Sequence, residues 1–225
     1  MKLLAIDTSG DACSAALVFD GAIEQILEIA PRRHGERILP MMQTLLDQAK
    51  LRVTDLDALA FGRGPGSFTG VRMATAVIQG VAFAANLPVV AVSTLAALAQ
   101  GQFRRGGQRH LLTALDARMG EVYWGCFTLD HQDLAVSCAM ERVCAPSHVQ
   151  VPKVADWFGV GSGFNAYTSE LSSVIAQQLL GIDPHGYCEA QDVAMLAAAD
   201  FRAGRLVGAD EAMPVYLRDQ VTRCQ

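Results

Sequence analysis

A strand pattern that occurs twice constrains the fold of this chain more than any other feature. Near the N-terminus the apolar run Leu3–Ile6 ends in Asp7, and strand-like runs follow through residue 29. After residue 109 the pattern returns: the apolar run His110–Leu115 ends in Asp116, and strand-like runs follow through residue 143. Short apolar runs separated by turn residues are typical of an antiparallel meander. Because an aspartate ends the first strand of both halves, we interpret the chain as a duplicated unit.

Helices and further strands complete each unit. Apolar residues at three- and four-residue spacing indicate helices, and Pro40 fits best in the first turn of its helix, near Ile38. The predicted helices cover residues 34–50, 71–86, 94–100, 167–180 and 191–203, and the strands between them cover residues 56–62, 88–92 and 157–161. The predicted fold class is therefore α/β, with two lobes that each contain a β-β-β-α-β-α unit and with a degenerate second lobe.

The polar, glycine- and arginine-rich segment 102–108 is the best candidate for a connection between the lobes. We expect an N-terminal lobe at residues 1–103 and a C-terminal lobe at residues 104–225. With 225 residues, of which 51% are hydrophobic, the chain has enough apolar material for a large core.

The run Gly62–Arg72 joins a predicted strand to a long predicted helix. Its four glycines and one proline force a tight turn, and Ser67 or Thr69 can cap the helix that follows. Free amide groups at a helix start bind anions, so the loop could cradle a phosphate. Alternatively it is a tight strand-to-helix connection without a ligand. The run matches neither GxGxxG nor the P-loop, which favours the second interpretation.

Composition argues against several classes of protein. A net charge of -5 disfavours tight, autonomous nucleic-acid binding, although Arg104, Arg105 and Arg109 form a local basic cluster. The six cysteines contain no CxxC pair and the five histidines no HxxH or HxxxH pair, so we predict no metal site and no disulfide framework. The chain starts directly with a strand and its apolar runs are interrupted early, so we expect a cytoplasmic protein without a spanning helix.

Two lobes with facing, aspartate-led turns suggest a cleft that once held a nucleotide phosphate. A phosphotransfer enzyme also needs a positioned base or a clamping lysine, and none of the three lysines lies in these turns. We therefore expect no catalytic residue and a weakened cleft, with weak nucleotide binding left open. The residues of this vestigial nucleotide cleft are Asp7, Thr8, Ser9, Asp116, Gly161 and Gly163.

Several motifs occur together in one order along the chain. They are Ile6–Ser9, Gly64–Arg72, Val92–Leu95, Asp116–Tyr123 and Tyr216–Arg218. Together they resemble the bacterial TsaB (YeaZ-type) family of tRNA threonylcarbamoyladenosine biosynthesis proteins, over essentially the whole chain. The resemblance implies a two-lobed actin/Hsp70/sugar-kinase-like (ASKHA) fold. It also implies a role in installing threonylcarbamoyl on N6 of adenosine 37 in tRNAs that read ANN codons.

In that family the protein is a non-catalytic partner of its paralogue TsaD, which transfers the group, and it works with the ATPase TsaE. The resemblance thus implies a heterodimer with a TsaD-type chain, contact with a TsaE-type ATPase, tRNA contact only through the complex, and a homodimer when the chain is alone. ATP and metal are expected on the partner proteins. The paralogue's two metal-binding histidines correspond here to Thr94 and Leu98, which cannot replace imidazole as ligands.

Two alternatives remain from the same superfamily: a small-molecule kinase, which the missing lysine disfavours, and a peptidase-like protein, which no triad or metal motif supports. A scaffold subunit should instead carry surplus apolar surface. The helices at residues 38–49 and 71–86 have such a surplus, and two of them could pair with two from a homologous chain as a four-helix bundle. We predict Met41, Met42, Leu45, Thr75 and Ile78 as outward residues, within an interface that comprises Leu39, Met41, Met42, Leu45, Val71, Ala74, Thr75, Ile78 and Ala82.

Overall fold

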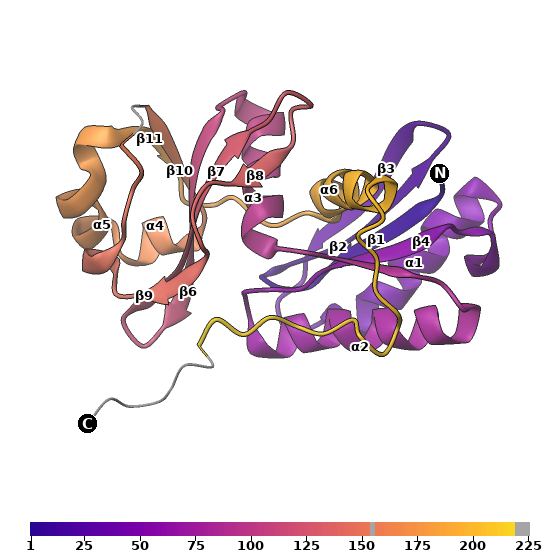
Figure 1. Cartoon of the computed structure of the whole chain (residues 1–225). Helices are drawn as coiled ribbons and strands as arrows, with labels where there is room; N and C mark the ends of the chain where they lie inside the picture. Colours follow the sequence, from indigo (N-terminus) through magenta and orange to yellow (C-terminus); the bar gives the residue numbers. More distant parts are fainter. Residues whose placement is uncertain (154–155, 219–225) are drawn as a thin grey trace.

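Each half of the chain forms one mixed β-sheet in the computed structural model, which describes residues 1–153 and 156–218 (Figure 1). The first sheet consists of β1 (Leu3–Asp7), β2 (Ala12–Phe19), β3 (Ala22–Ile29), β4 (Ala58–Gly62) and β5 (Val89–Val92). The second consists of β6 (His110–Arg118), β7 (Glu121–Leu129), β8 (Ala135–Ser137), β9 (Arg142–Cys144), β10 (Trp157–Val160) and β11 (Leu179–Asp183). The helices are α1 (His34–Ala49), α2 (Phe68–Ala85), α3 (Thr94–Gly106), α4 (Ser162–Ala166), α5 (Thr168–Ile175) and α6 (Ala190–Arg202), with short 3₁₀ turns at Val53–Asp55, Pro146–His148 and Ala176–Gln178.

The two sheets share one topology. Their orders are β3-β2-β1-β4-β5 and β8-β7-β6-β10-β11, with β9 paired to β7. In both, the first three strands are antiparallel and the last two continue parallel to the first. The predicted two-lobed α/β fold with a duplicated unit is therefore confirmed. The second lobe is the degenerate copy, because a 3₁₀ turn stands between β9 and β10 where the first lobe has α1.

Helices cover both faces of each sheet. In the first lobe, α1 and α2 enclose one hydrophobic core and α6 encloses the other. In the second lobe, α4 and α5 cover one face and α3 the other. The helices α3 and α6 are thus exchanged between lobes: α3 follows β5 but packs on the second sheet, and α6 ends the second unit but packs on the first. They lie side by side in the middle of the molecule (Figure 1).

The structure corrects several predicted boundaries. α3 continues to Gly106 through the predicted connector, because Gln102 is buried and Arg104 bonds to α6. The predicted division after residue 103 falls inside this helix and stays a prediction.

α1 begins at His34 and contains Pro40 in its interior. The burial of Ile38 and Met41 and an ion pair between Arg37 and Glu28 of β3 hold this part of the helix on the sheet, which offsets the hydrogen bond that proline cannot donate.

Two predicted elements of the second lobe are divided. The run at 134–143 forms two short strands, β8 and β9. The predicted helix at 167–180 ends at Ile175, and β11 follows as a strand parallel to β10. Leu171, Ile175 and Leu179 keep a four-residue spacing across this change, so periodicity did not mark it.

A strap formed by residues 207–218 joins the lobes. It leaves the first sheet, extends along α2 and reaches the second lobe (Figure 1). Val207 exchanges two backbone hydrogen bonds of 2.9 Å with Val89, and the Val215 amide donates to the Arg63 carbonyl at 2.8 Å. At its far end Arg218 donates to the carbonyl of Ala117, near the end of β6, at 2.7 Å.

Candidate functional site

The glycine loop, residues 62–70, is filled by the turn that follows β1. A Cβ on Gly66 would lie 2.6 Å from the carbonyl oxygen of Ser9, and a Cβ on Gly70 would overlap the carbonyl oxygen of Thr8. Hydrogen bonds fix this contact: the Thr8 hydroxyl donates to the Gly70 carbonyl, and the Ser67 amide donates to the Ser9 carbonyl, both at 2.7 Å. Only glycine allows two backbones to approach so closely.

Two amide groups at the start of α2 are used within the chain. Of the two predicted candidates, Ser67 is the N-cap: its hydroxyl accepts from the Gly70 amide, and its carbonyl accepts from the Val71 amide at 2.8 Å. The Ser9 amide donates to the Asp7 carboxylate at 3.0 Å. The loop is therefore a tight strand-to-helix connection that packs against the turn after β1.

Asp7 lies beneath the loop and is 1% exposed. One carboxylate oxygen accepts hydrogen bonds from the amide and the hydroxyl of Ser9, the latter at 2.8 Å. Gly62 makes room for the other oxygen, since a Cβ there would overlap it. Burial raises the pKa of the Asp7 carboxyl to about 6, against the hydrogen bonds from Ser9 and Cys188, which lower it. The side chain is thus enclosed by its own chain.

The other three predicted cleft residues lie in the second lobe. The Asp116 carboxylate accepts from the Tyr167 hydroxyl at 3.1 Å and pairs with Arg118 at 2.9 Å. A Cβ on Gly161 or Gly163 would lie 2.5 or 3.0 Å from the carbonyl oxygen of Ala114. These glycines therefore let the start of α4 approach β6. As a nucleotide site, the six cleft residues remain a prediction.

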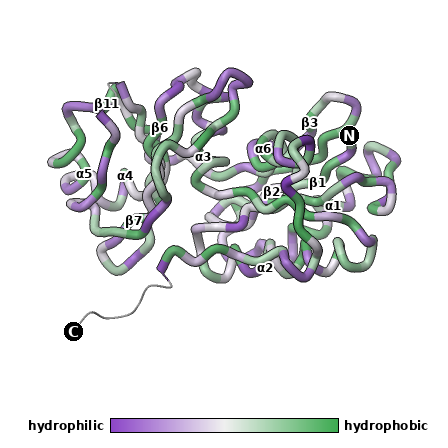
Figure 2. The backbone as a smooth tube through the Cα atoms, in the orientation of Figure 1, coloured by the Kyte–Doolittle hydropathy of each residue, from purple (hydrophilic) through white to green (hydrophobic). Residues whose placement is uncertain are grey.

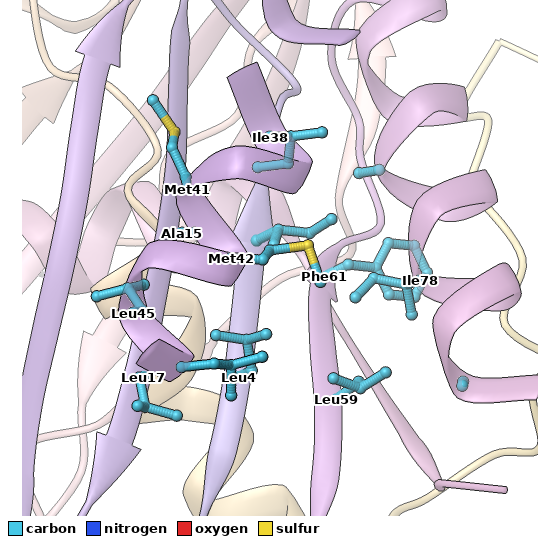
Figure 3. Close-up of a cluster of buried hydrophobic side chains, with 14 of the residues drawn as sticks. Leu4, Ala15, Leu17, Ile38, Met41, Met42, Leu45, Leu59, Phe61 and Ile78 are labelled. Atoms are coloured by element: carbon cyan, nitrogen blue, oxygen red, sulfur yellow. The ribbon is translucent and has the colours of Figure 1, made fainter. Parts of the chain in front are cut away.

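Eight of the nine residues predicted at the partner interface are buried within the chain. The side chains of Met41, Met42 and Leu45 point from α1 toward the sheet, and Ile78 points toward it from α2 (Figure 3). The prediction that these four residues and Thr75 face outward is wrong. Periodicity locates an apolar stripe on each helix but not the side that the sheet occupies. The buried eight are Met41, Met42, Leu45, Val71, Ala74, Thr75, Ile78 and Ala82, whereas Leu39 is 51% exposed.

A different set of apolar residues on the same two helices is open to solvent. Phe83 on α2 is 84% exposed, and a Cβ on Gly80 would meet no atom within 4 Å. The helices adjoin where a Cβ on Gly35 would touch the Met73 side chain at 3.4 Å, and Leu39 lies one turn beyond Gly35 on the same side of α1. We define the α1–α2 face as Leu39, Met73, Ala76, Val77, Gly80, Phe83 and Ala84.

The apolar character of α2 exceeds what its buried side needs. By length and composition, this helix of 18 residues with a hydropathy of 1.3 could cross a membrane, contrary to the prediction that no segment reaches that limit. Of its residues, 33% are buried, and these pack on the first sheet. Hydrophobic residues colour much of both sheets and of α2 in Figure 2. The surplus on α2 therefore lies on the α1–α2 face.

The basic cluster at the C-terminal end of α3 is paired with acidic side chains. Arg104 and Arg105 pair with Glu189 at 3.0 and 2.6 Å, and Arg109 pairs with Asp133 at 2.7 Å. Within residues 1–153 and 156–218, no group of three or more His, Cys, Asp or Glu side chains could hold a metal ion. Thr94 and Leu98, at 1% and 0% exposure, are packed inside the molecule.

Comparison with known proteins assigns these features to a family. The family model for TsaD, tRNA N6-adenosine threonylcarbamoyltransferase, matches residues 26–223. The tRNA threonylcarbamoyladenosine biosynthesis protein TsaB of Escherichia coli (strain K12) is 40% identical over 226 residues, which cover 98% of this chain and 96% of that protein. The chain belongs to the TsaB family.

Other proteins are similar to this chain over nearly its whole length. TsaB of Haemophilus influenzae is 38% identical, with 99% of this chain and 95% of that protein covered. The crystal structure named YeaZ from Pseudomonas aeruginosa is 45% identical, with a TM-score of 0.91, and covers 96% of this chain and 99% of its own. A second Pseudomonas aeruginosa structure with the same values is described as similar to peptidase YEAZ. The resemblance of the sequence motifs to the TsaB family is thus confirmed.

Proposed function

We propose that the chain is a non-catalytic subunit required to form the threonylcarbamoyl group on N6 of adenosine 37 in tRNAs that read ANN codons. It dimerises with a TsaD-type paralogue in the cytoplasm, and the pair recruits a TsaE-type ATPase. ATP, metal and tRNA bind through the partner proteins. The names of the relatives support the pathway. The filled glycine loop and the enclosed Asp7 support a role without catalysis, since a small-molecule kinase needs its carboxylate within reach of the nucleotide.

The observation that carries this proposal is the α1–α2 face. Extended apolar patches on soluble proteins mark interaction sites, and Phe83 supplies a large side chain at 84% exposure. Ala76, Gly80 and Ala84 recur every four residues along α2 and allow a second helix to approach closely. Two helices of the partner would complete a four-helix bundle over this face. The match to the TsaD model supports a partner with the same fold.

The same face explains the expected behaviour of the isolated chain. A second copy presents identical helices, so the chain alone forms a homodimer through the α1–α2 face. The TsaD-type partner competes for that face. Dissociation of the homodimer on addition of the partner is therefore expected in light-scattering measurements.

Reconstitution of the modification tests the proposal. The chain, the TsaD-type partner, the TsaE-type ATPase and unmodified tRNA are combined with ATP and an activated threonylcarbamoyl donor, and threonylcarbamoyladenosine is quantified by nucleoside mass spectrometry. We expect product only when all three proteins are present and no ATP turnover by the chain alone. Robust turnover by the isolated chain, or full product without it, contradicts the proposal.

A pair of α1–α2 variants tests the docking face itself. Phe83→Asp places a charge in the face and is expected to abolish co-purification with the TsaD-type partner. Gln48→Asp is the control, because Gln48 is also exposed but lies on the side of α1 opposite Leu39. Equal recovery of the partner with both variants would exclude this face.

A further inference from the structure

Arg72 stands near the start of α2 in a fixed orientation. Its guanidinium lies 3.8 Å from the ring centre of Phe68 and 5.6 Å from that of Tyr216. Its Nε donates a hydrogen bond to the Tyr216 hydroxyl at 2.7 Å. One ring belongs to the helix and the other to the strap, and their centres are 6.0 Å apart. Cation–π contacts and this hydrogen bond hold the side chain in place before any partner arrives.

The charge of Arg72 is not neutralised within the described part of the chain. A guanidinium carries five N–H groups, and one of them is used for Tyr216. The Arg72 side chain is exposed. No acidic side chain among residues 1–153 and 156–218 forms an ion pair with it. Arg218, in the same strap as Tyr216, differs in this respect: it pairs with Glu121 at 2.8 Å.

A pocket of about 320 Å³ opens beside Arg72, between α2 and the strap. Two polar groups of its wall already donate within the chain: the Thr75 hydroxyl to the Val71 carbonyl at 2.9 Å, and the Gln79 side-chain amide to the Ala212 carbonyl at 3.0 Å. Arg72, at the edge, is the one charged residue of the lining. The lining residues are Arg72, Thr75, Ala76, Gln79, Met213, Pro214 and Tyr216.

We propose that this pocket receives an apolar side chain of the TsaD-type partner and that Arg72 binds a carboxylate beside it on the same partner element. This inference rests on the proposed function, because the pocket shares Ala76 with the α1–α2 face and so continues the docking surface. The planar fork of arginine matches a carboxylate with two parallel hydrogen bonds. Arginine is enriched among the residues that dominate binding energy at protein interfaces, and a partner over the pocket would remove Arg72 from solvent.

The surroundings favour a protein carboxylate over an RNA phosphate. Phosphate recognition uses several cations along a backbone, whereas Arg72 adjoins an apolar pocket and the chain carries a net charge of -5. The fixed orientation of Arg72 also lowers the entropy that binding would cost. The strap therefore takes part in docking as well as in joining the lobes.

Affinity measurements with the TsaD-type partner test this site. Arg72→Gln is expected to weaken binding by about 30-fold, and Arg72→Lys, which keeps the charge but loses the fork, by about 5-fold. The wild-type affinity should fall with salt more steeply than that of Arg72→Gln. Arg109→Gln is the control, because Arg109 is an arginine of the second lobe whose partner Asp133 lies in the same lobe.

Phe83→Asp is measured alongside, because it tests the α1–α2 face independently of the pocket. If Phe83→Asp abolishes binding and Arg72→Gln binds like wild type, the pocket inference is overturned and the docking face stands. If both bind like wild type, the docking face fails as well. If Arg72→Gln lowers only the affinity of the assembled complex for tRNA, the anion is a phosphate and the inference is again overturned. Recovery of Arg72→Glu by one acid-to-arginine change in the partner supports it and identifies the carboxylate.

Discussion

Arg104 of α3 donates two hydrogen bonds to the carboxylate of Asp192 on α6, at 2.9 and 3.0 Å. Asp192 is 0% exposed, and Glu189 adds a second carboxylate 3.0 Å from the same guanidinium. Because α3 packs on the second sheet and α6 on the first, this pair lies where the exchanged helices meet. It therefore links the two halves of the duplicated fold.

Arg104→Met is expected to lower the free energy of unfolding by about 3 kcal/mol, because it leaves Asp192 buried without its main partner. Asp192→Asn removes the charge and should cost about 1 kcal/mol. The double variant should lose less than the sum of the two, since no buried charge remains. Urea unfolding of the four proteins at neutral pH measures this coupling, and strictly additive losses would show that the pair contributes no joint stability.

Gly70 and Gly80 offer a matched pair in one helix. Gly70→Ala is expected to destabilise the chain by about 3 kcal/mol, since the alanine Cβ would overlap the Thr8 carbonyl oxygen. Gly80→Ala meets no atom and should stabilise the monomer by about 0.5–1 kcal/mol through helix propensity. Thermal unfolding at a concentration at which the chain is monomeric distinguishes the two.

The same Gly80→Ala variant probes close helix approach. If a partner helix contacts α2 at this position, the added methyl group should weaken binding to the TsaD-type partner while the isolated chain becomes more stable. A variant that gains stability and keeps its full affinity would place the partner helix elsewhere.

Much of the fold follows from local patterns. Asp7 ends β1, Asp116 lies two residues before the end of β6, and turn residues follow each of these strands. The exchange of α3 and α6 could not be predicted in this way. Both helices are apolar on one side, and that pattern is satisfied by either sheet. The contacts between the exchanged helices, such as the bond from Arg104 to Asp192, 88 residues away, have no local signature in the sequence.

The candidate site was predictable in part. The glycine run indicated a close approach of backbone at residues 62–70, but its partner, the turn at Thr8, is set by the pairing of β1 with β4. The helices of the docking face were found from their surplus of apolar residues. Their outward sides were not, because Ile78 and Phe83 are both apolar, and only the position of the sheet distinguishes them.

Asp7 is expected to make stability depend on pH. Burial raises its pKa from 3.8 to about 6, so the folded chain holds this proton more tightly than the unfolded chain. The stabilisation is complete below pH 3.8, decreases between pH 3.8 and 6, and is lost above that range. The total change is about 3 kcal/mol for a shift of this size.

Asp7→Asn removes this dependence and keeps the oxygen that accepts from Ser9. Relative to wild type, the variant should be similar in stability near pH 4 and more stable by up to about 3 kcal/mol at pH 8. Urea unfolding from pH 4 to pH 8 gives the difference between the two proteins. A difference that does not change with pH would contradict the raised pKa.

Charges placed on opposite sides of α2 should have opposite consequences. Ile78→Asp buries a carboxylate at a position that is 0% exposed, beside Phe61 and Leu59, and is expected to cost more than about 4 kcal/mol, which is enough to unfold many domains. Phe83→Asp changes a side chain that is exposed in the monomer and should alter the stability of the monomer by less than about 0.5 kcal/mol. Circular dichroism during heating measures both, at a concentration at which the chain is monomeric. A folded, stable Ile78→Asp protein would show that the sheet does not cover this side of α2, and the α1–α2 face would then have to be redefined.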